Sequence, residues 1–350
     1  MRDHARGWLL VAVLFSLLVQ MTAAQAPLSP APRLGLGKDA DGRPLPFGVP
    51  PYFPPDTPLG GGPHPAVMIT DAGLPEHVIY RPAQLDAAGP LPIVVWGNGA
   101  CMHAGNRFRV FLTEIASHGF LVISAGRLED PSLEVGPQEN PAVRRPGAPP
   151  PPPAVPAPPG SARSRRSTAD HMRQAIDWAV AEHTREGSAL RGRLVPTRIA
   201  VAGQSCGGGL SMQLASDPRV TTVGIFNSGS RVTAGPGGLP ADPAAAKARL
   251  DAVHTPILFL TGDAELDIAF PGAQESVEYL TRVPVFWAWQ ERLQHIGTYG
   301  APGGGSIGRI AVAWFAWQLK GDRTAGRMFT GPGCGLCSEP TWHVTRKRLD

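Results

Sequence analysis

The sequence predicts an α/β protein built on a doubly wound, mostly parallel sheet. Short apolar runs with the length of buried strands alternate along the chain with segments of helical periodicity. After removal of the first residues, the chain is long enough for one large domain of this class or two small ones. A strand that runs through a tight glycine turn directly into a helix, near residue 205, is a third indication. We therefore expect a single α/β domain over residues 63–330.

The first two strands, at 65–69 and 77–80, are expected to form an antiparallel pair. The remaining predicted strands are at 91–96, 120–123, 198–202, 220–226, 256–260 and 283–287. The predicted helices are at 108–117, 168–181, 208–217, 241–253 and 307–319. Because only the connection 227–255 is available for a lid and the helix at 241–253 is expected to cover the sheet, we expect no large lid and an open cleft.

The chain begins with the pattern of a secretory signal peptide over residues 1–26. Two arginines precede an apolar run at 8–19, and Ala24-Gln25-Ala26 has the small residues of a cleavage site. This predicts a protein secreted to the periplasm or the extracellular space, with no stable membrane insertion after cleavage. An uncleaved N-terminal anchor is the alternative.

Two further segments lie outside the expected core. Residues 27–62 are rich in proline and glycine and are expected to form an extended leader, and residues 136–167 contain a proline tract that cannot pair in a sheet. We predict that the tract is a disordered insertion that serves as an inert spacer, with a binding segment as the alternative. Residues 331–350 are expected to form a C-terminal tail that contains a C-x-x-C sequence.

The charge balance gives little support to nucleic-acid binding. The net charge is +4, from 32 Lys and Arg against 28 Asp and Glu. The two basic clusters, 163–166 and 346–348, are not interleaved with aromatic residues. We expect solvated surface at both.

The segment Gly203–Gly207 has the sequence G-Q-S-C-G, which matches the G-x-S-x-G nucleophile elbow. It follows a strand and precedes a helix, as that motif requires, and so predicts Ser205 as a nucleophile. A second match, at Ser306, follows a Gly/Pro loop and is expected to be only a glycine-rich turn.

A serine nucleophile needs a histidine base that is held by a carboxylate. In proteins with the G-x-S-x-G elbow, these residues follow one another along the chain in the order serine, acid, histidine. Asp267, after the strand at 256–260, is the predicted acid, with Asp263 as the alternative. His295, in the loop after the next strand, is the predicted base. His343 is its only competitor downstream of Asp267 and lies in the predicted tail.

The oxyanion of an acyl-transfer reaction needs two backbone N–H donors. We expect one from Cys206 and one from the loop after Trp96, with Asn98 first and Gly99 second. Since both loops must meet at the oxyanion, we predict a disulfide between Cys101 and Cys206, with two free thiols as the alternative.

The remaining cysteines, Cys334 and Cys337, could form half of a zinc site, but the sequence has no second pair to complete it. We predict a local disulfide there and no bound metal.

These motifs together resemble secreted α/β-hydrolases near the dienelactone hydrolase and polyester (cutinase and PET) hydrolase branches. The resemblance covers about residues 65–347 without the proline insertion, and it rests on the segments G-N-G-x-C, G-Q-S-C-G-G, D-I-A-F, H-I-G-T-Y and W-Q-L-K-G-D. It implies the α/β-hydrolase fold, with Ser205, Asp267 and His295 as triad and Asn98 and Cys206 as backbone donors. The chain departs from the pattern in having serine where dienelactone hydrolases have cysteine, and Ile296 after the histidine.

The sequence therefore predicts a secreted serine hydrolase that cleaves small-molecule or polymeric carboxylic esters without a metal or organic cofactor; it predicts no oligomeric state. The alternatives are an amidase or peptidase with the same triad, a binding protein of this fold without turnover, and a wall or matrix adaptor that uses the proline tract.

Overall fold

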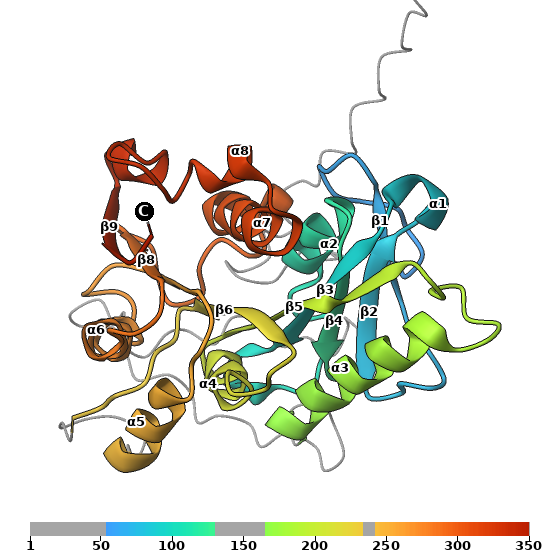
Figure 1. Cartoon of the computed structure of the whole chain (residues 1–350), viewed down its shortest axis with the longest axis horizontal. Helices are drawn as coiled ribbons and strands as arrows, with labels where there is room; N and C mark the ends of the chain where they lie inside the picture. Colours follow the sequence, from blue (N-terminus) through green and yellow to red (C-terminus); the bar gives the residue numbers. More distant parts are fainter. Residues whose placement is uncertain (1–53, 130–164, 234–241, 350) are drawn as a thin grey trace, which may run out of the picture. The chain divides into compact units, whose positions relative to one another are not determined.

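A sheet of nine strands runs through the part of the chain that the computed structural model describes, residues 54–129, 165–233 and 242–349 (Figure 1). The strand order is β1-β2-β4-β3-β5-β6-β7-β8-β9, which places β5 at the centre. The strands are β1 (Ala66–Ile69), β2 (His77–Pro82), β3 (Leu91–Gly97), β4 (Leu121–Ala125), β5 (Leu194–Gln204), β6 (Val220–Phe226), β7 (Ile257–Thr261), β8 (Val285–Gln290) and β9 (Trp342–Lys347).

The inner strands are parallel, and the edges of the sheet are antiparallel. β4, β3, β5, β6, β7 and β8 pair in parallel, whereas β1, β2 and β9 pair antiparallel to their neighbours. Since parallel strands end at the same edge, the loops after β3, β5, β6, β7 and β8 gather at one side of the sheet. All the sequence-predicted site residues except those of the C-terminal segment lie in or beside these loops.

Two layers of helices cover the sheet, because successive side chains of each inner strand point to opposite faces. In β3, Ile93 and Val95 belong to one buried cluster, and Val94 and Trp96 belong to the other. α3, α4, α5 and α6 pack on the first face, and α2 and α7 pack on the second (Figure 1). The helices are α1 (Leu85–Ala88), α2 (Arg109–Ser117), α3 (Ala169–Thr184), α4 (Cys206–Gln213), α5 (Pro243–Asp251), α6 (Phe270–Tyr279), α7 (Gly305–Lys320) and α8 (Arg323–Gly326), with short 3₁₀ turns η1 (Gly99–Cys101), η3 (Pro302–Gly304) and η4 (Leu336–Ser338).

Local sequence explains where several helices begin and end. Asp242 accepts hydrogen bonds from the N–H groups of Ala244 and Ala245, and Pro243 occupies the first turn of α5. α7 ends at Gly321, whose φ of 70° is in the region that favours glycine.

The α/β class and the mostly parallel sheet are confirmed. Besides the short 3₁₀ turns, four elements of the described residues were not predicted: the short helices α1 and α8, helix α6 after Asp267, and β9, which forms in the segment expected to be a tail. β9 pairs antiparallel with β8 from Trp342 to Lys347, so this segment completes one edge of the sheet.

The predicted signal peptide, residues 27–53 of the leader, residues 136–164 of the proline insertion and part of the connection before α5 lie outside the described residues. The end of the leader is described, and Leu59 bridges to Ala66. The prediction of disorder is wrong for the last residues of the insertion, 165–167, because Ser167 is buried. Within the described residues, none of the helices has the length and apolar character needed to cross a membrane.

Candidate active site

Ser205 occupies the sharp turn between the central strand β5 and helix α4. Its φ of 53° and ψ of −119° are strained for a residue with a side chain. The turn is fixed to β6 and the loop after it, because Ser205 N–H donates to Phe226 O at 2.9 Å and Ser205 O accepts from Ser228 Oγ at 2.7 Å. The strained conformation is thus maintained by hydrogen bonds outside the turn.

The glycines on either side of Ser205 are required by close backbone contacts. A Cβ on Gly203 would lie 2.4 Å from the Gly207 carbonyl carbon, and a Cβ on Gly207 would lie 2.0 Å from Gly97 O. Both distances are far below van der Waals contact, so a larger residue would displace the backbone. The two glycines therefore allow the backbone at the start of α4 to pack directly against the backbone at the end of β3.

The structure brings Ser205, His295 and Asp267 together from three separate loops. His295 Nε2 lies 2.9 Å from Ser205 Oγ, and His295 Nδ1 lies 2.6 Å from Asp267 Oδ1. The histidine ring is mostly buried, and the Asp267 side chain is fully buried. A carboxylate accepts hydrogen bonds only, so His295 Nδ1 carries the hydrogen and Nε2 faces the serine hydroxyl as an acceptor.

Asp267 is held in its ionised form. Burial raises the pKa of this carboxyl, but the hydrogen bond and charge of His295 and the N–H groups of Gly262 and Ala269 more than offset burial, so that the pKa lies below its usual range. Gly262 N–H donates to Oδ2 at 2.8 Å, and Ala269 N–H donates to Oδ1 at 2.9 Å. The carboxylate is therefore available to orient the imidazole and to stabilise its charged form.

Two residues of this site were missed by the sequence analysis. Asn227 Nδ2 donates to Asp267 Oδ2 at 2.7 Å, and the Tyr299 hydroxyl donates to Asn227 Oδ1 at 2.6 Å. Tyr299 is buried, and burial followed by the charge of Asp267 raises its pKa well above the usual value, so it remains a donor. The signals were present in the sequence: Asn227 directly follows a predicted strand, and Tyr299 belongs to the same H-I-G-T-Y segment as His295.

Gln204, the residue before Ser205, connects the serine turn to the histidine loop. Its Nε2 donates to His295 O at 3.0 Å. Its Oε1 lies so close to Gly99 that a Cβ there would be 2.0 Å from it. Gln204 therefore holds the backbone of His295 in place through this hydrogen bond and contacts the loop after β3.

That loop is joined to the serine turn by a disulfide between Cys101 and Cys206, whose Cα atoms are 5.1 Å apart. Asn98 is buried, and its side-chain amide donates to Ala125 O at 2.7 Å and to Ala104 O at 3.0 Å. The Asn98 side chain is thus used to fold its own loop, and only the Asn98 backbone faces the serine turn. A Cβ on Gly207 would lie 2.8 Å from Asn98 N, which shows how closely the two segments approach.

The alternative residues are placed elsewhere. Asp263 accepts from the N–H groups of Glu265 and Arg292, at 2.9 and 3.0 Å, and so holds the turn after β8; these bonds lower its pKa. His343 stacks on Trp289 at a centroid distance of 3.9 Å and lies 2.9 Å from Glu291 Oε1.

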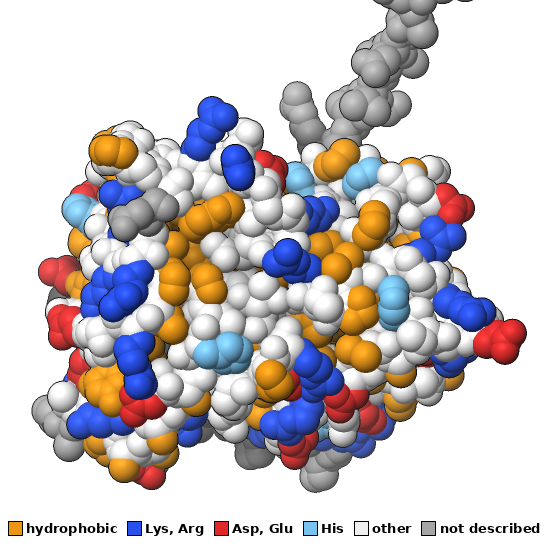
Figure 2. Space-filling view, viewed as in Figure 1, with side chains coloured by type: hydrophobic (Ala, Val, Ile, Leu, Met, Phe, Trp, Pro, Cys, Tyr) orange, Lys and Arg blue, Asp and Glu red, His pale blue; other side chains and the backbone are white. Residues whose placement is uncertain are grey.

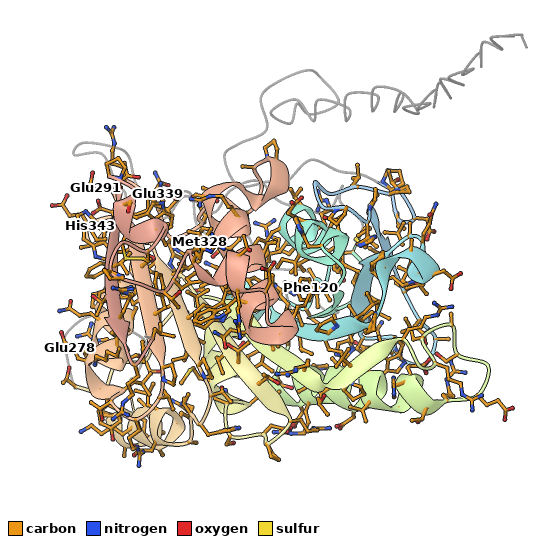
Figure 3. All side chains as sticks on the ribbon, turned by 45° about the horizontal axis from the view of Figure 1, so that its top comes forward. Phe120, Glu278, Glu291, Met328, Glu339 and His343 are labelled. Carbon is orange, nitrogen blue, oxygen red and sulfur yellow. A yellow bond between two sulfur atoms is a disulfide. The ribbon has the colours of Figure 1, made fainter. Side chains whose placement is uncertain are left out.

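Figure 3 shows His343 beside Glu291 at the β9 side of the molecule. Ser306 lies in the first turn of α7 and donates to Gln290 Oε1 at 2.9 Å. The structure therefore joins His295 to Asp267 and Ser205, and gives the three alternatives other partners.

Cys334 and Cys337 form a second disulfide, with Cα atoms 5.0 Å apart. Across residues 54–129, 165–233 and 242–349, no group of three or more His, Cys, Asp or Glu side chains is arranged to hold a metal ion. On the face seen in Figure 2, Lys and Arg are interspersed with Asp and Glu.

Comparison with known proteins supplies no assignment: no protein-family model matches the chain, and no curated protein matches it significantly.

Proposed function

We propose that the protein is a serine hydrolase that cleaves carboxylic esters through an acyl-enzyme. The observation that carries the proposal is the hydrogen-bonded chain from buried Asp267 through His295 to Ser205, with the serine on a strained turn between a strand and a helix. This arrangement is the one by which a serine hydroxyl becomes a nucleophile at neutral pH.

In the first half of the reaction, Ser205 Oγ attacks the ester carbonyl carbon while His295 Nε2 takes the hydroxyl proton. The tetrahedral intermediate collapses, the bond to the alcohol oxygen breaks, and His295 returns the proton to the departing alcohol. In the second half, His295 takes a proton from water, the hydroxide attacks the acyl carbon, and the acid leaves with Ser205 Oγ–H restored. Asp267 stabilises the imidazolium in both halves of the reaction and stays ionised throughout.

The negative charge on the carbonyl oxygen requires N–H donors beside Ser205. We assign Cys206 N–H, at the start of α4, and a backbone N–H of the loop after β3, with Asn98 first and Gly99 second. Support comes from the close approach of the two segments and from the Cys101–Cys206 disulfide that joins them. Two disulfides also fit the proposal that the protein is secreted, because disulfides persist in oxidising compartments.

The geometry also fits an amidase or peptidase, since the same groups perform both reactions. A matched pair of substrates that differ only in ester against amide, each assayed with wild type and Ser205→Ala, separates the two. Purified protein should release p-nitrophenol from p-nitrophenyl esters in a Ser205-dependent manner, and a series of acyl chain lengths would define the acyl group. A folded, disulfide-bonded protein without turnover on any ester or amide would contradict the proposal and favour a binding protein of this fold.

A further inference from the structure

A second serine–histidine–carboxylate array lies beside the candidate active site. His103 is buried, its Nε2 lies 2.6 Å from Glu76 Oε2, and its Nδ1 lies 3.1 Å from Ser167 Oγ. Arg127 binds the other oxygen of Glu76, and its hydrogen bond is the main reason that the pKa of Glu76 falls to about 2. An ionised Glu76 accepts only, so His103 Nε2 carries a hydrogen and points at the carboxylate.

This array has no room to act as a second catalytic centre. Ser167 is 2% exposed, and its hydroxyl lies within reach of Ala125 O at 3.3 Å and Met102 O at 3.5 Å. A nucleophile needs access to a carbonyl carbon, which a hydroxyl enclosed by backbone carbonyls does not have. The array must therefore serve the segments that it connects.

Those segments converge on the loop that carries Cys101. Ser167 N–H donates to Cys101 O at 2.8 Å, and Arg127 N–H donates to His103 O at 3.2 Å. Cys101 is in turn bonded to Cys206, the residue after Ser205. His103 lies two residues along the chain from Cys101, so a shift of the histidine would be passed through this short segment to the proposed oxyanion donors.

We propose that His103 is a positioning residue for the oxyanion loop, acting through Glu76 on one side and Ser167 on the other. It touches neither substrate nor the reacting atoms. It fixes residues 98–103 so that the backbone N–H of this loop faces the developing charge beside Ser205. This inference rests on the proposed function, because it concerns the same reaction.

The test uses three variants of the full-length secreted protein. His103→Gln keeps a donor toward Glu76, Ser167→Ala removes only the hydroxyl partner, and His103→Ala removes both contacts. The matched control is His118→Ala, because His118, directly after α2, forms a similar pair with Glu114 of that helix at 3.1 Å. Each variant is assayed with a p-nitrophenyl ester after titration of active sites by the initial burst, so that misfolded protein does not count.

Per titrated site, we expect His103→Ala to lower kcat by about 10- to 100-fold with KM nearly unchanged, since a misplacement of about 1 Å has that order of effect. His103→Gln and Ser167→Ala should fall between this variant and wild type, and His118→Ala should match wild type. Amide hydrogen exchange of residues 98–106 should be faster in His103→Ala and Ser167→Ala, with exchange in β5 unchanged.

An unchanged kcat per titrated site in all three variants would overturn the inference and leave the proposed function intact. Unchanged hydrogen exchange of the loop would also overturn it. A wild-type protein that is folded but inert would overturn the proposed function, and the inference with it.

Discussion

The hydroxyl of Tyr299 donates to Asn227 Oδ1 at 2.6 Å, and the amide of the same asparagine donates to Asp267 at 2.7 Å. The buried carboxylate is thus supported, through Asn227, by Tyr299, which lies four positions beyond His295 in the sequence. Asn227 has a φ of 41°, which places its side chain between the two partners at the cost of some backbone strain. The line from tyrosine to serine contains five side chains, of which three were predicted.

We expect Tyr299→Phe to lower both stability and activity. The variant leaves Asn227 Oδ1 without its donor in a buried site, which typically costs about 1–3 kcal/mol of unfolding free energy. A looser Asn227 should also reduce kcat, by about 3- to 10-fold, if one ordinary hydrogen bond is lost from the support of Asp267. Urea unfolding and ester kinetics measure the two effects. A variant equal to wild type in both would show that the hydrogen bonds of Tyr299 and Asn227 do not support Asp267.

A comparison of Asp267→Asn with Asp263→Asn tests the assignment of the acid. An asparagine at 267 must still accept from Gly262 and Asn227, so its amide would face His295 Nδ1 and force the wrong tautomer. We expect kcat to fall by about 10⁴-fold, as for such a change in a comparable triad. Asp263→Asn should retain activity near wild type, because Asp263 holds only backbone N–H groups. Equal activity of the two variants would contradict the assignment.

The two disulfides should contribute very differently to stability. The Cys101–Cys206 bond spans a sequence separation of 105 residues, and the Cys334–Cys337 bond spans 3. In the chain-entropy account, closing the longer loop is worth about 4–5 kcal/mol. The double variant Cys101→Ala/Cys206→Ala should therefore have a much lower urea midpoint than Cys334→Ala/Cys337→Ala. Similar midpoints in the two would show that the long bond adds little to stability.

His77 predicts a loss of stability in mild acid. The ring is buried, and its Nε2 donates to His171 O at 2.7 Å. Burial lowers the pKa of His77 from 6.5 to about 4, although its hydrogen bond to His171 and the charge of Glu76 act in the opposite direction. The unfolded chain therefore takes up the proton first, so this contribution is complete above pH 6.5 and is lost as the pH falls toward 4. The loss should be about 3 kcal/mol.

Urea unfolding of wild type and His77→Gln at pH 7 and pH 4 isolates the term, because glutamine keeps a donor but does not titrate. The free energy of unfolding of wild type, relative to that of His77→Gln, should fall between pH 7 and pH 4. If the two curves shift in parallel, another group is responsible.

The sequence was informative where local chemistry decides the structure. The G-x-S-x-G segment between a strand and a helix is recognisable because Gly203 and Gly207 leave no space for a side chain, which is a local steric requirement. The chain order of serine, acid and histidine then limited the predicted acid and base to the loops after β7 and β8. Asp267 is buried and Asp263 is partly exposed, but the apolar residues after Asp267 do not explain this difference, because Ile268 is 62% exposed. Asp267 is instead enclosed by hydrogen-bond donors, among them Asn227 and Gly262.

What the sequence did not indicate depends on contacts between distant segments. β9 contains charged and polar residues and forms because β8 offers an unpaired edge. Asn227 and Tyr299 each lie in the sequence near a predicted strand end or site residue, but they are 72 positions apart, so the sequence does not indicate that they bind each other. Likewise, Glu76, His103 and Ser167 come from three separate segments and meet only in the folded protein.

The most direct test of the central claim is covalent labelling of the folded, disulfide-bonded protein with a fluorophosphonate, followed by peptide mass spectrometry. The account predicts one adduct, on Ser205, that is lost in Ser205→Ala and in His295→Ala and is retained in Ser306→Ala. An adduct on Ser306, or no adduct on Ser205 in protein shown to be folded, would contradict it.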